Sequence, residues 1–223
     1  FSRVETNGGA FEQVNLLYGE NPNKAVRAFT KPFHEAGIQT HMLDRGLNGL
    51  RMYPVPADVR RLMYKVKHAQ GVDITRIFCG LNEVRNIIPS IHYALEAGMI
   101  PQATLCITFS PVHTVEYYTA IAERLIEAGA PEICLKDMAG VGRPEMLGRL
   151  TKAIKERHPE IIIQYHGHSG PGLSMASILE VCENGADIID VAMEPISWGK
   201  VHPDVISVQA MLKDAGLVPL QHQ

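Results

Sequence analysis

The sequence repeats one local pattern, in which an amphipathic stretch ends at a glycine and a run of β-forming residues follows. Glycine just past a helix end accepts the left-handed backbone conformation, so each repeat predicts a helix end followed by a strand. The glycines that close these stretches are Gly37, Gly71, Gly98, Gly129 and Gly185. In one further repeat, before residue 161, Pro159 supplies the break. One strand and one helix about every 30 residues predict a parallel sheet covered by helices.

The expected strands are rich in apolar residues, as is typical of parallel strands that are buried on both faces. They are expected at residues 4–6, 38–43, 73–78, 103–109, 132–136, 161–168 and 187–193, with a last helix over 203–216. An ordinary (β/α)8 barrel closes with eight strands. We therefore predict a single α/β domain over 1–223, a TIM barrel that lacks its first βα unit in this chain. The start at Phe1, inside a strand-like stretch, agrees with this prediction. A doubly wound sheet is the alternative, but no glycine-rich phosphate loop follows an early strand.

Composition excludes several classes of function. The net charge of −3, with no long run of Lys or Arg, argues against nucleic-acid binding. No apolar run approaches the ~20 residues of a membrane span, and no signal peptide is visible, so we expect a cytoplasmic protein. The four cysteines form no CxxC pair and are expected to be buried thiols.

In a parallel barrel, functional side chains lie at the C-terminal ends of the strands. His166 and His168 close the strand expected over 161–168, and their spacing places both imidazoles on one face, with Gly167 leaving room between them. Two such imidazoles can chelate Zn²⁺, Mn²⁺ or Co²⁺. The alternative is a pair of hydrogen-bonded histidines at the barrel rim.

Three other positions near strand ends are candidates. Lys136, followed by Asp137, ends the strand one βα unit earlier, and its amine could take up CO₂ as a carbamate that binds metal; a rim salt bridge is the alternative. Arg45 could hold a carboxylate in a bidentate manner, or it could pair with Asp44 at the surface. Thr108 could bind substrate, or it could bond to local backbone groups.

Several runs along the chain, taken together, resemble the biotin-dependent carboxyltransferase domain family. Members of this family include pyruvate carboxylase, transcarboxylase and the alpha subunit of oxaloacetate decarboxylase. The runs are GLNEVRN (80–86), CITFSPVHTVEYY (106–118), CLKDMAG (134–140), YHGHSGPGLSM (165–175) and ADIIDVAMEPIS (186–197). They fall in the family's order, and the resemblance covers essentially the whole chain. Barrels with an HxH strand, such as 3-hydroxy-3-methylglutaryl-CoA lyases, are more distant relatives.

The resemblance implies that His166 and His168 are metal ligands and that Lys136 is a carbamylated ligating lysine. It also implies that Arg45, in LDRGLNG, holds the carboxylate of a 2-oxo acid. Lys200 stands where the family has a threonine that moves a proton between biotin and the enol of pyruvate. The family's remaining metal ligand, an aspartate on its first strand, and a nearby glutamine have no counterpart here. Two further departures are Cys79 for a pocket aspartate and Met52 for a tyrosine.

The implied reaction is carboxyl transfer between oxaloacetate and biotin, through a pyruvate enolate stabilised by Zn, Co or Mn. Biotin would arrive on a separate carrier protein or domain, because the chain has no biotinyl-lysine motif. The resemblance further implies a homo-oligomer and, as one assembly, a membrane decarboxylase complex. Two alternatives stay open: a metal-dependent aldol or Claisen lyase or synthase on the same barrel, and a degenerate, non-catalytic subunit.

Overall fold

The structure, a computed structural model, describes residues 1–217. Strands and helices alternate along the chain, as the glycine pattern predicts. The strands are β1 (Arg3–Gly8), β2 (Gln39–Asp44), β3 (Ile74–Ile77), β4 (Ile100–Cys106), β5 (Glu132–Asp137), β6 (Ile162–Gly167) and β7 (Ile188–Ile189). The helices are α1 (Gly9–Leu17), α2 (Pro22–Glu35), α3 (Ala57–Ala69), α4 (Ile88–Glu96), α5 (Val115–Glu127), α6 (Pro144–Arg157), α7 (Ser174–Glu183) and α8 (Val205–Asp214).

Within residues 1–217, the seven strands are hydrogen-bonded in the order in which they follow one another in the sequence. The pairings of β1 with β2, β2 with β3, β3 with β4, and β6 with β7 are parallel. A doubly wound sheet would reverse its strand order at a switch point, whereas consecutive parallel strands joined through helices are typical of a (β/α) barrel. The predicted fold class, a partial barrel with seven βα units, is confirmed.

The ends of the helices form as the sequence predicts. Asn21 caps α2 by accepting a hydrogen bond from the backbone N–H of Asn23 at 3.0 Å, and Pro22 takes the first helical position. Gly98 and Gly129, just past α4 and α5, have φ of 82° and 101°, the left-handed region that favours glycine. Two strands differ from their predictions: β4 ends at Cys106, so residues 107–109 lie beyond it, and β7 covers only Ile188–Ile189 of the predicted 187–193.

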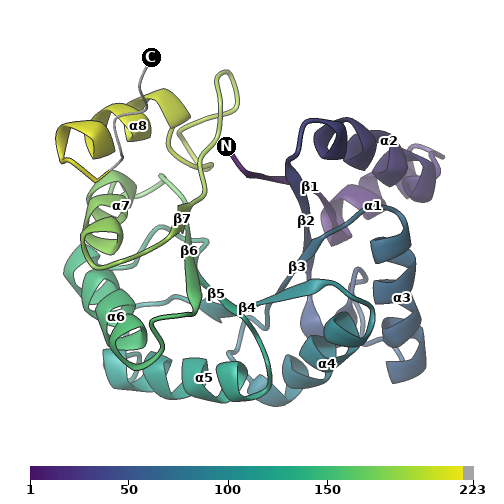
Figure 1. Cartoon of the computed structure of the whole chain (residues 1–223), viewed down its shortest axis with the longest axis horizontal. Coiled ribbons are helices and arrows are strands. Elements are labelled where there is room, and N and C mark those ends of the chain that lie inside the picture. Colours follow the sequence, from purple (N-terminus) through teal and green to yellow (C-terminus); the bar gives the residue numbers. More distant parts are fainter. Residues whose placement is uncertain (218–223) are drawn as a thin grey trace. The chain divides into compact units, whose positions relative to one another are not determined.

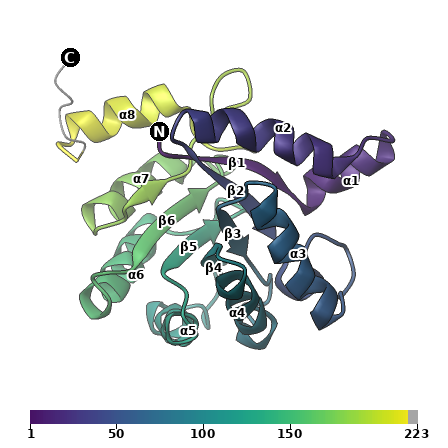
Figure 2. The same ribbon diagram turned by 45° about the vertical axis from the view of Figure 1, so that its right-hand side comes forward.

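The chain divides into two compact units. The first comprises Phe1–Thr104 and Arg124–Glu132, and the second comprises Leu105–Glu123 and the chain from Ile133 onward. In the first unit α2 packs along β1 and β2, and α4 packs on β3 (Figure 1). In the second unit α7 packs on β6 and between α6 and α8 (Figure 2). The predicted extent of one domain over 1–223 stays a prediction.

Each unit has its own buried apolar residues. In the first, fully buried side chains include Met42, Ile74, Ile77 and Ile91, and in the second they include Leu135, Leu150 and Ile163. The four cysteines, all among the described residues, are free thiols; Cys106 and Cys134 are buried as expected, whereas Cys79 and Cys182 are only half-buried. Within the described residues, no helix combines the length and apolar composition that a membrane crossing requires.

The end of β2 carries a buried carboxyl group, Asp44. Its Oδ2 accepts hydrogen bonds from the hydroxyls of Tyr64 and, at 3.3 Å, Thr75. Burial raises the pKa of Asp44 to about 7, and these hydrogen bonds only partly oppose the effect. The folded protein therefore holds this proton up to a pH at which an unfolded chain has released it.

This difference predicts that stability falls as the pH rises from about 4 to about 7. Over that range the unfolded state binds fewer protons at Asp44 than the folded state, so the free energy of unfolding decreases with pH. We expect Asp44→Asn to reduce the difference in the free energy of unfolding between pH 5 and pH 8 by on the order of 2–4 kcal/mol. Urea unfolding at the two pH values measures this difference. Asp58→Asn, at an exposed position in α3, serves as the control. An unchanged pH slope in Asp44→Asn would contradict the assignment.

Candidate metal centre

The HxH motif places two imidazoles side by side, as its spacing predicts. His166 belongs to the end of β6 and His168 follows directly, so both rings come to the same side of the strand. Their Nε2 atoms lie 3.2 Å apart, and His166 is buried. A Cβ at Gly167 would overlap the ring of Tyr165, so glycine is required between the two histidines.

A third imidazole joins the pair from the loop between β7 and α8. The ring centroid of His202 lies 4.3 Å from that of His166 and 4.8 Å from that of His168. One ring nitrogen from each histidine falls within 4.8 Å of the others. The backbone N–H of Ser169 donates to the carbonyl of Val201 at 2.8 Å, which holds this loop beside the end of β6. We define His166, His168 and His202 as the histidine cluster.

Each ring of the histidine cluster is oriented through its Nδ1 atom. His166 Nδ1 lies 2.7 Å from Oδ2 of Asp190, His168 Nδ1 lies 2.6 Å from the carbonyl of Lys200, and His202 Nδ1 lies 2.8 Å from the carbonyl of Gly167. These oxygens are acceptors, so each Nδ1 is the protonated donor. A neutral ring that donates through Nδ1 carries its lone pair on Nε2, the arrangement usual for histidines that bind metal.

Lys136 reaches the same place from β5. Its side chain is buried, and its Nζ lies 3.0 Å from Nε2 of His166. The expectation that Lys136 lies beside the histidine pair is thus confirmed in its geometry. The carboxylate of Asp137 accepts the backbone N–H groups of Val141 and Gly142 at 2.9 and 2.8 Å and so holds the loop that follows β5. Burial is the main reason that the pKa of Asp137 is raised.

These donors fit a divalent transition metal. Two nitrogens bound to one tetrahedral ion at about 2.0–2.1 Å lie about 3.3 Å apart. The Nε2 atoms of His166 and His168 are separated by 3.2 Å. A cation beside two such nitrogens relieves the repulsion between their lone pairs, and the amine of Lys136, with Nζ 3.0 Å from Nε2 of His166, lies at this place. Imidazole nitrogens suit Zn, Co and related ions better than Mg or Ca.

Two other predicted site residues lie in the same unit as the histidine cluster. Lys200 is exposed, and its backbone carbonyl is the acceptor for His168 Nδ1. Thr108 is exposed beyond the end of β4, and its backbone N–H donates to the hydroxyl of Tyr118 at 2.8 Å. The catalytic role predicted for Lys200 and the substrate-binding role predicted for Thr108 stay predictions.

Arg45 belongs to the first unit, directly after β2. Its Nη1 donates to the carbonyl of Arg51 at 3.2 Å, and its Nη2 donates to Oε1 of Gln13 at 3.4 Å. A Cβ at Gly9 would lie 2.7 Å from Nη1, so this glycine makes room for the guanidinium group. Asp44 is buried and bonded to Tyr64, which argues against a surface ion pair between Asp44 and Arg45.

The two departures from the family pattern also lie in the first unit. The sulfur of Met52 is 3.5 Å from Nη1 of Arg45, so this residue still neighbours the arginine. Cys79 is half-buried, with its sulfur 3.5 Å from Nδ2 of Asn86.

Sequence reasoning missed His202 and Asp190. Asp190 follows the short strand β7, so the rule that functional groups sit at strand ends could have found it. His202 lies in the loop beyond β7, where no periodic spacing links it to the HxH pair.

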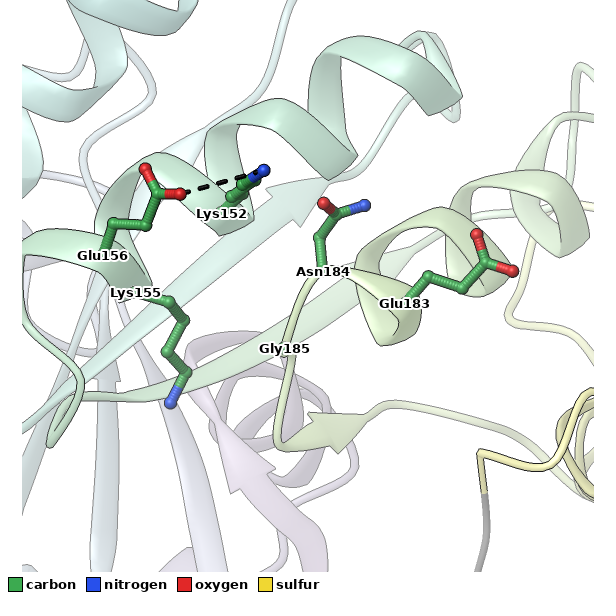
Figure 3. A pocket seen from close by; sticks show the side chains of 6 residues that line it. All are labelled: Lys152, Lys155, Glu156, Glu183, Asn184 and Gly185. Carbon is green, nitrogen blue, oxygen red and sulfur yellow. Dashed lines mark ion pairs between the residues drawn. The ribbon is translucent and has the colours of Figure 1, made fainter.

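A separate polar cleft in the second unit has a volume of about 430 Å³ (Figure 3). Its lining residues come from α6, from the last residue of α7 and from the turn that follows: Lys152, Lys155, Glu156, Glu183, Asn184 and Gly185. Lys155 bonds to Asp187 and to the carbonyl of Ile161, both at 2.7 Å, and Lys152 pairs with Glu156 at 3.8 Å. Both lysines of this cleft thus have partners within the protein.

Comparison with known proteins places the chain in a family. Residues 81–199 match the family model described as HMGL-like. A pyruvate carboxylase component of Methanocaldococcus jannaschii is 36% identical over 222 residues, which cover 97% of this chain and 39% of the relative. The methylmalonyl-CoA carboxyltransferase 5S subunit of Propionibacterium freudenreichii subsp. shermanii is 34% identical over 215 residues, which cover 96% of this chain and 42% of the relative.

Solved structures agree with these relatives. The carboxyl transferase domain of Rhizobium etli pyruvate carboxylase, with pyruvate and biocytin, matches with a TM-score of 0.89 at 29% identity, over 95% of this chain and 36% of that one. The same domain with 3-hydroxypyruvate gives a TM-score of 0.92 at 28% identity, over 100% of this chain and 38% of that one. The chain thus spans about two fifths of the length of these two curated relatives. The resemblance to carboxyltransferase domains is confirmed, and the chain belongs to the HMGL-like family.

Proposed function

We propose that this chain forms the carboxyltransferase site of a biotin-dependent enzyme that acts on a small 2-oxo acid. The observation that carries the proposal is the convergence of Lys136, His166 and His168 from the ends of β5 and β6. Carboxyltransferases among the relatives support the assignment of reaction class. The proposed ligands of a divalent ion (Zn, Co or Mn) are the two histidines and Lys136, the lysine as its carbamate.

The proposed reaction converts oxaloacetate to pyruvate. The bond between C3 of oxaloacetate and its departing carboxyl group breaks, and that carboxyl joins a ring nitrogen of biotin. The proton from this nitrogen ends on C3 of pyruvate, so atoms and charge balance. The reverse direction carboxylates pyruvate. A bound divalent ion would supply a Lewis acid that polarises the 2-oxo group and favours the enolate.

The chain's own residues would position the substrate and move the proton. Arg45, whose planar guanidinium group carries more N–H donors than its bonds to Arg51 and Gln13 use, would bind the substrate's carboxyl group. Lys200, on the loop whose carbonyl orients His168, would carry the proton between biotin and C3. Thr108, exposed after β4, would contact the substrate. Biotin would be delivered by a carrier protein or domain, in a cytoplasmic homo-oligomer or a membrane decarboxylase complex.

The test is pyruvate formation from oxaloacetate, followed with lactate dehydrogenase and NADH in the presence and absence of free biotin. We expect biotin to raise the enzymatic rate above the background decarboxylation measured without protein. Turnover of an acyl-CoA or aldehyde without biotin would instead identify an aldol or Claisen enzyme. Metal binding without turnover of either substrate class would identify a degenerate subunit, a candidate motivated by Cys79 and Lys200.

A further inference from the structure

We infer that His202 is a third imidazole ligand of the metal centre, so that the site binds its ion through three histidine nitrogens. The inference builds on the proposed function, which names only His166, His168 and Lys136 as ligands. A ring nitrogen of His202 lies within 4.8 Å of ring nitrogens of both other histidines. Ligand nitrogens on one tetrahedral ion lie about 3.3 Å apart, so the His202 ring would move toward the other two when the ion binds.

The hydrogen bond at the far side of the His202 ring supports this role. Its Nδ1 donates to the carbonyl of Gly167, the residue between the two histidines of the HxH motif. In the neutral ring, the lone pair is then on Nε2. Metal-binding histidines regularly donate their other N–H to a carbonyl or carboxylate in this way. The Nδ1 atoms of His166 and His168 are bonded in the same way to the carboxylate of Asp190 and the carbonyl of Lys200. All three rings are therefore oriented through Nδ1.

The backbone around His202 is held in place. The N–H of Trp198 donates to the carbonyl of His202 at 2.8 Å, and the N–H of Val201 donates back to the carbonyl of Trp198 at 2.8 Å. A parallel bridge joins Ala192 to Asp204, and the Asp204 carboxylate caps α8 through the N–H of Ile206 at 2.9 Å. The backbone that carries the His202 imidazole is thus held by hydrogen bonds on both sides. This restraint lowers the entropic cost of binding an ion.

Three neutral imidazoles give the centre a chemical preference. Nitrogen donors favour Zn and Co over Mn, which prefers carboxylate and water oxygens. They also bind metal without any carbamate on Lys136. We therefore expect the protein to bind Zn²⁺ or Co²⁺ in CO₂-depleted buffer, and to bind Mn²⁺ more weakly.

The experiment is titration calorimetry of Zn²⁺ into the chelator-treated protein, for wild type, His202→Ala and the control His92→Ala, an exposed histidine in α4. We expect His202→Ala to weaken binding by about 100-fold or more, because even indirect partners of metal ligands contribute 10–100-fold, and His92→Ala to match wild type. Equal affinity in wild type and His202→Ala would overturn the inference and leave the proposed function standing. A wild type that binds no metal would overturn both.

A second measurement uses only the wild-type protein, so its result does not depend on whether His202→Ala folds. X-ray absorption at the zinc edge of the loaded wild-type protein counts imidazole ligands through their outer-ring scattering. Three imidazoles per ion would support the assignment of His202. Two imidazoles would overturn it, and the same spectrum would still support a centre of His166, His168 and an oxygen donor.

Discussion

Replacement of His166 by alanine is expected to abolish high-affinity metal binding and the turnover that depends on it. His166 is the residue that the other donors share: its Nε2 lies 3.2 Å from Nε2 of His168 and 3.0 Å from Nζ of Lys136. Its loss removes a ligand and the centre of the cluster together. We expect the rate of oxaloacetate decarboxylation to fall on the order of 100- to 1000-fold, the range for loss of a main electrostatic stabiliser of the transition state.

A graded variant separates loss of metal from general damage. Asp190→Asn keeps the size of the residue that accepts the proton of His166 Nδ1 at 2.7 Å but removes its charge. Metal affinity in this variant should fall by about 10- to 100-fold, between wild type and His166→Ala. Calorimetry measures the affinity, and circular dichroism checks that each variant is folded. Metal binding retained in folded His166→Ala would contradict the assignment of this histidine.

Replacement of Arg45 by glutamine is expected to raise the KM for the 2-oxo acid and to change kcat little. A charged hydrogen bond to a carboxylate contributes about 1.5–3 kcal/mol, which corresponds to roughly a 10- to 100-fold rise in KM. Binding that is equal in the ground state and the transition state affects KM and leaves kcat unchanged. Steady-state kinetics with oxaloacetate would give both parameters.

Two further variants make the Arg45 experiment specific. Arg45→Lys keeps the charge and loses the planar pair of donors, so its KM should lie between wild type and Arg45→Gln. Arg27→Gln, at an exposed position in α2, should leave KM unchanged. If Arg45→Gln binds the substrate as tightly as wild type, the carboxylate is held elsewhere.

The parts of the molecule that the sequence predicted are those encoded by neighbouring residues. Gly98 and Gly129 mark helix ends because the left-handed backbone there disfavours other residues. His166 and His168 meet because every second residue of a strand points to the same face. Lys136 lies beside them because consecutive parallel strands are neighbours in this sheet.

The parts that the sequence did not predict depend on contacts between distant segments. His202 reaches the cluster through hydrogen bonds of its loop, such as that between Ser169 and Val201, and no periodicity encodes those. Similarly, the raised pKa of Asp44 comes from burial and not from its neighbours in the chain. Thr108 was expected within a strand, but β4 ends at Cys106 and leaves Thr108 exposed.

Elemental analysis of the purified protein measures its metal content and so tests the metal centre itself. We expect close to one Zn, Co or Mn per chain in wild type, retained after dialysis against metal-free buffer. We expect this metal to be missing from folded His166→Ala. A folded wild-type protein that holds none of these metals, and takes none up when they are supplied, would contradict the metal centre and the carboxyltransferase function built on it.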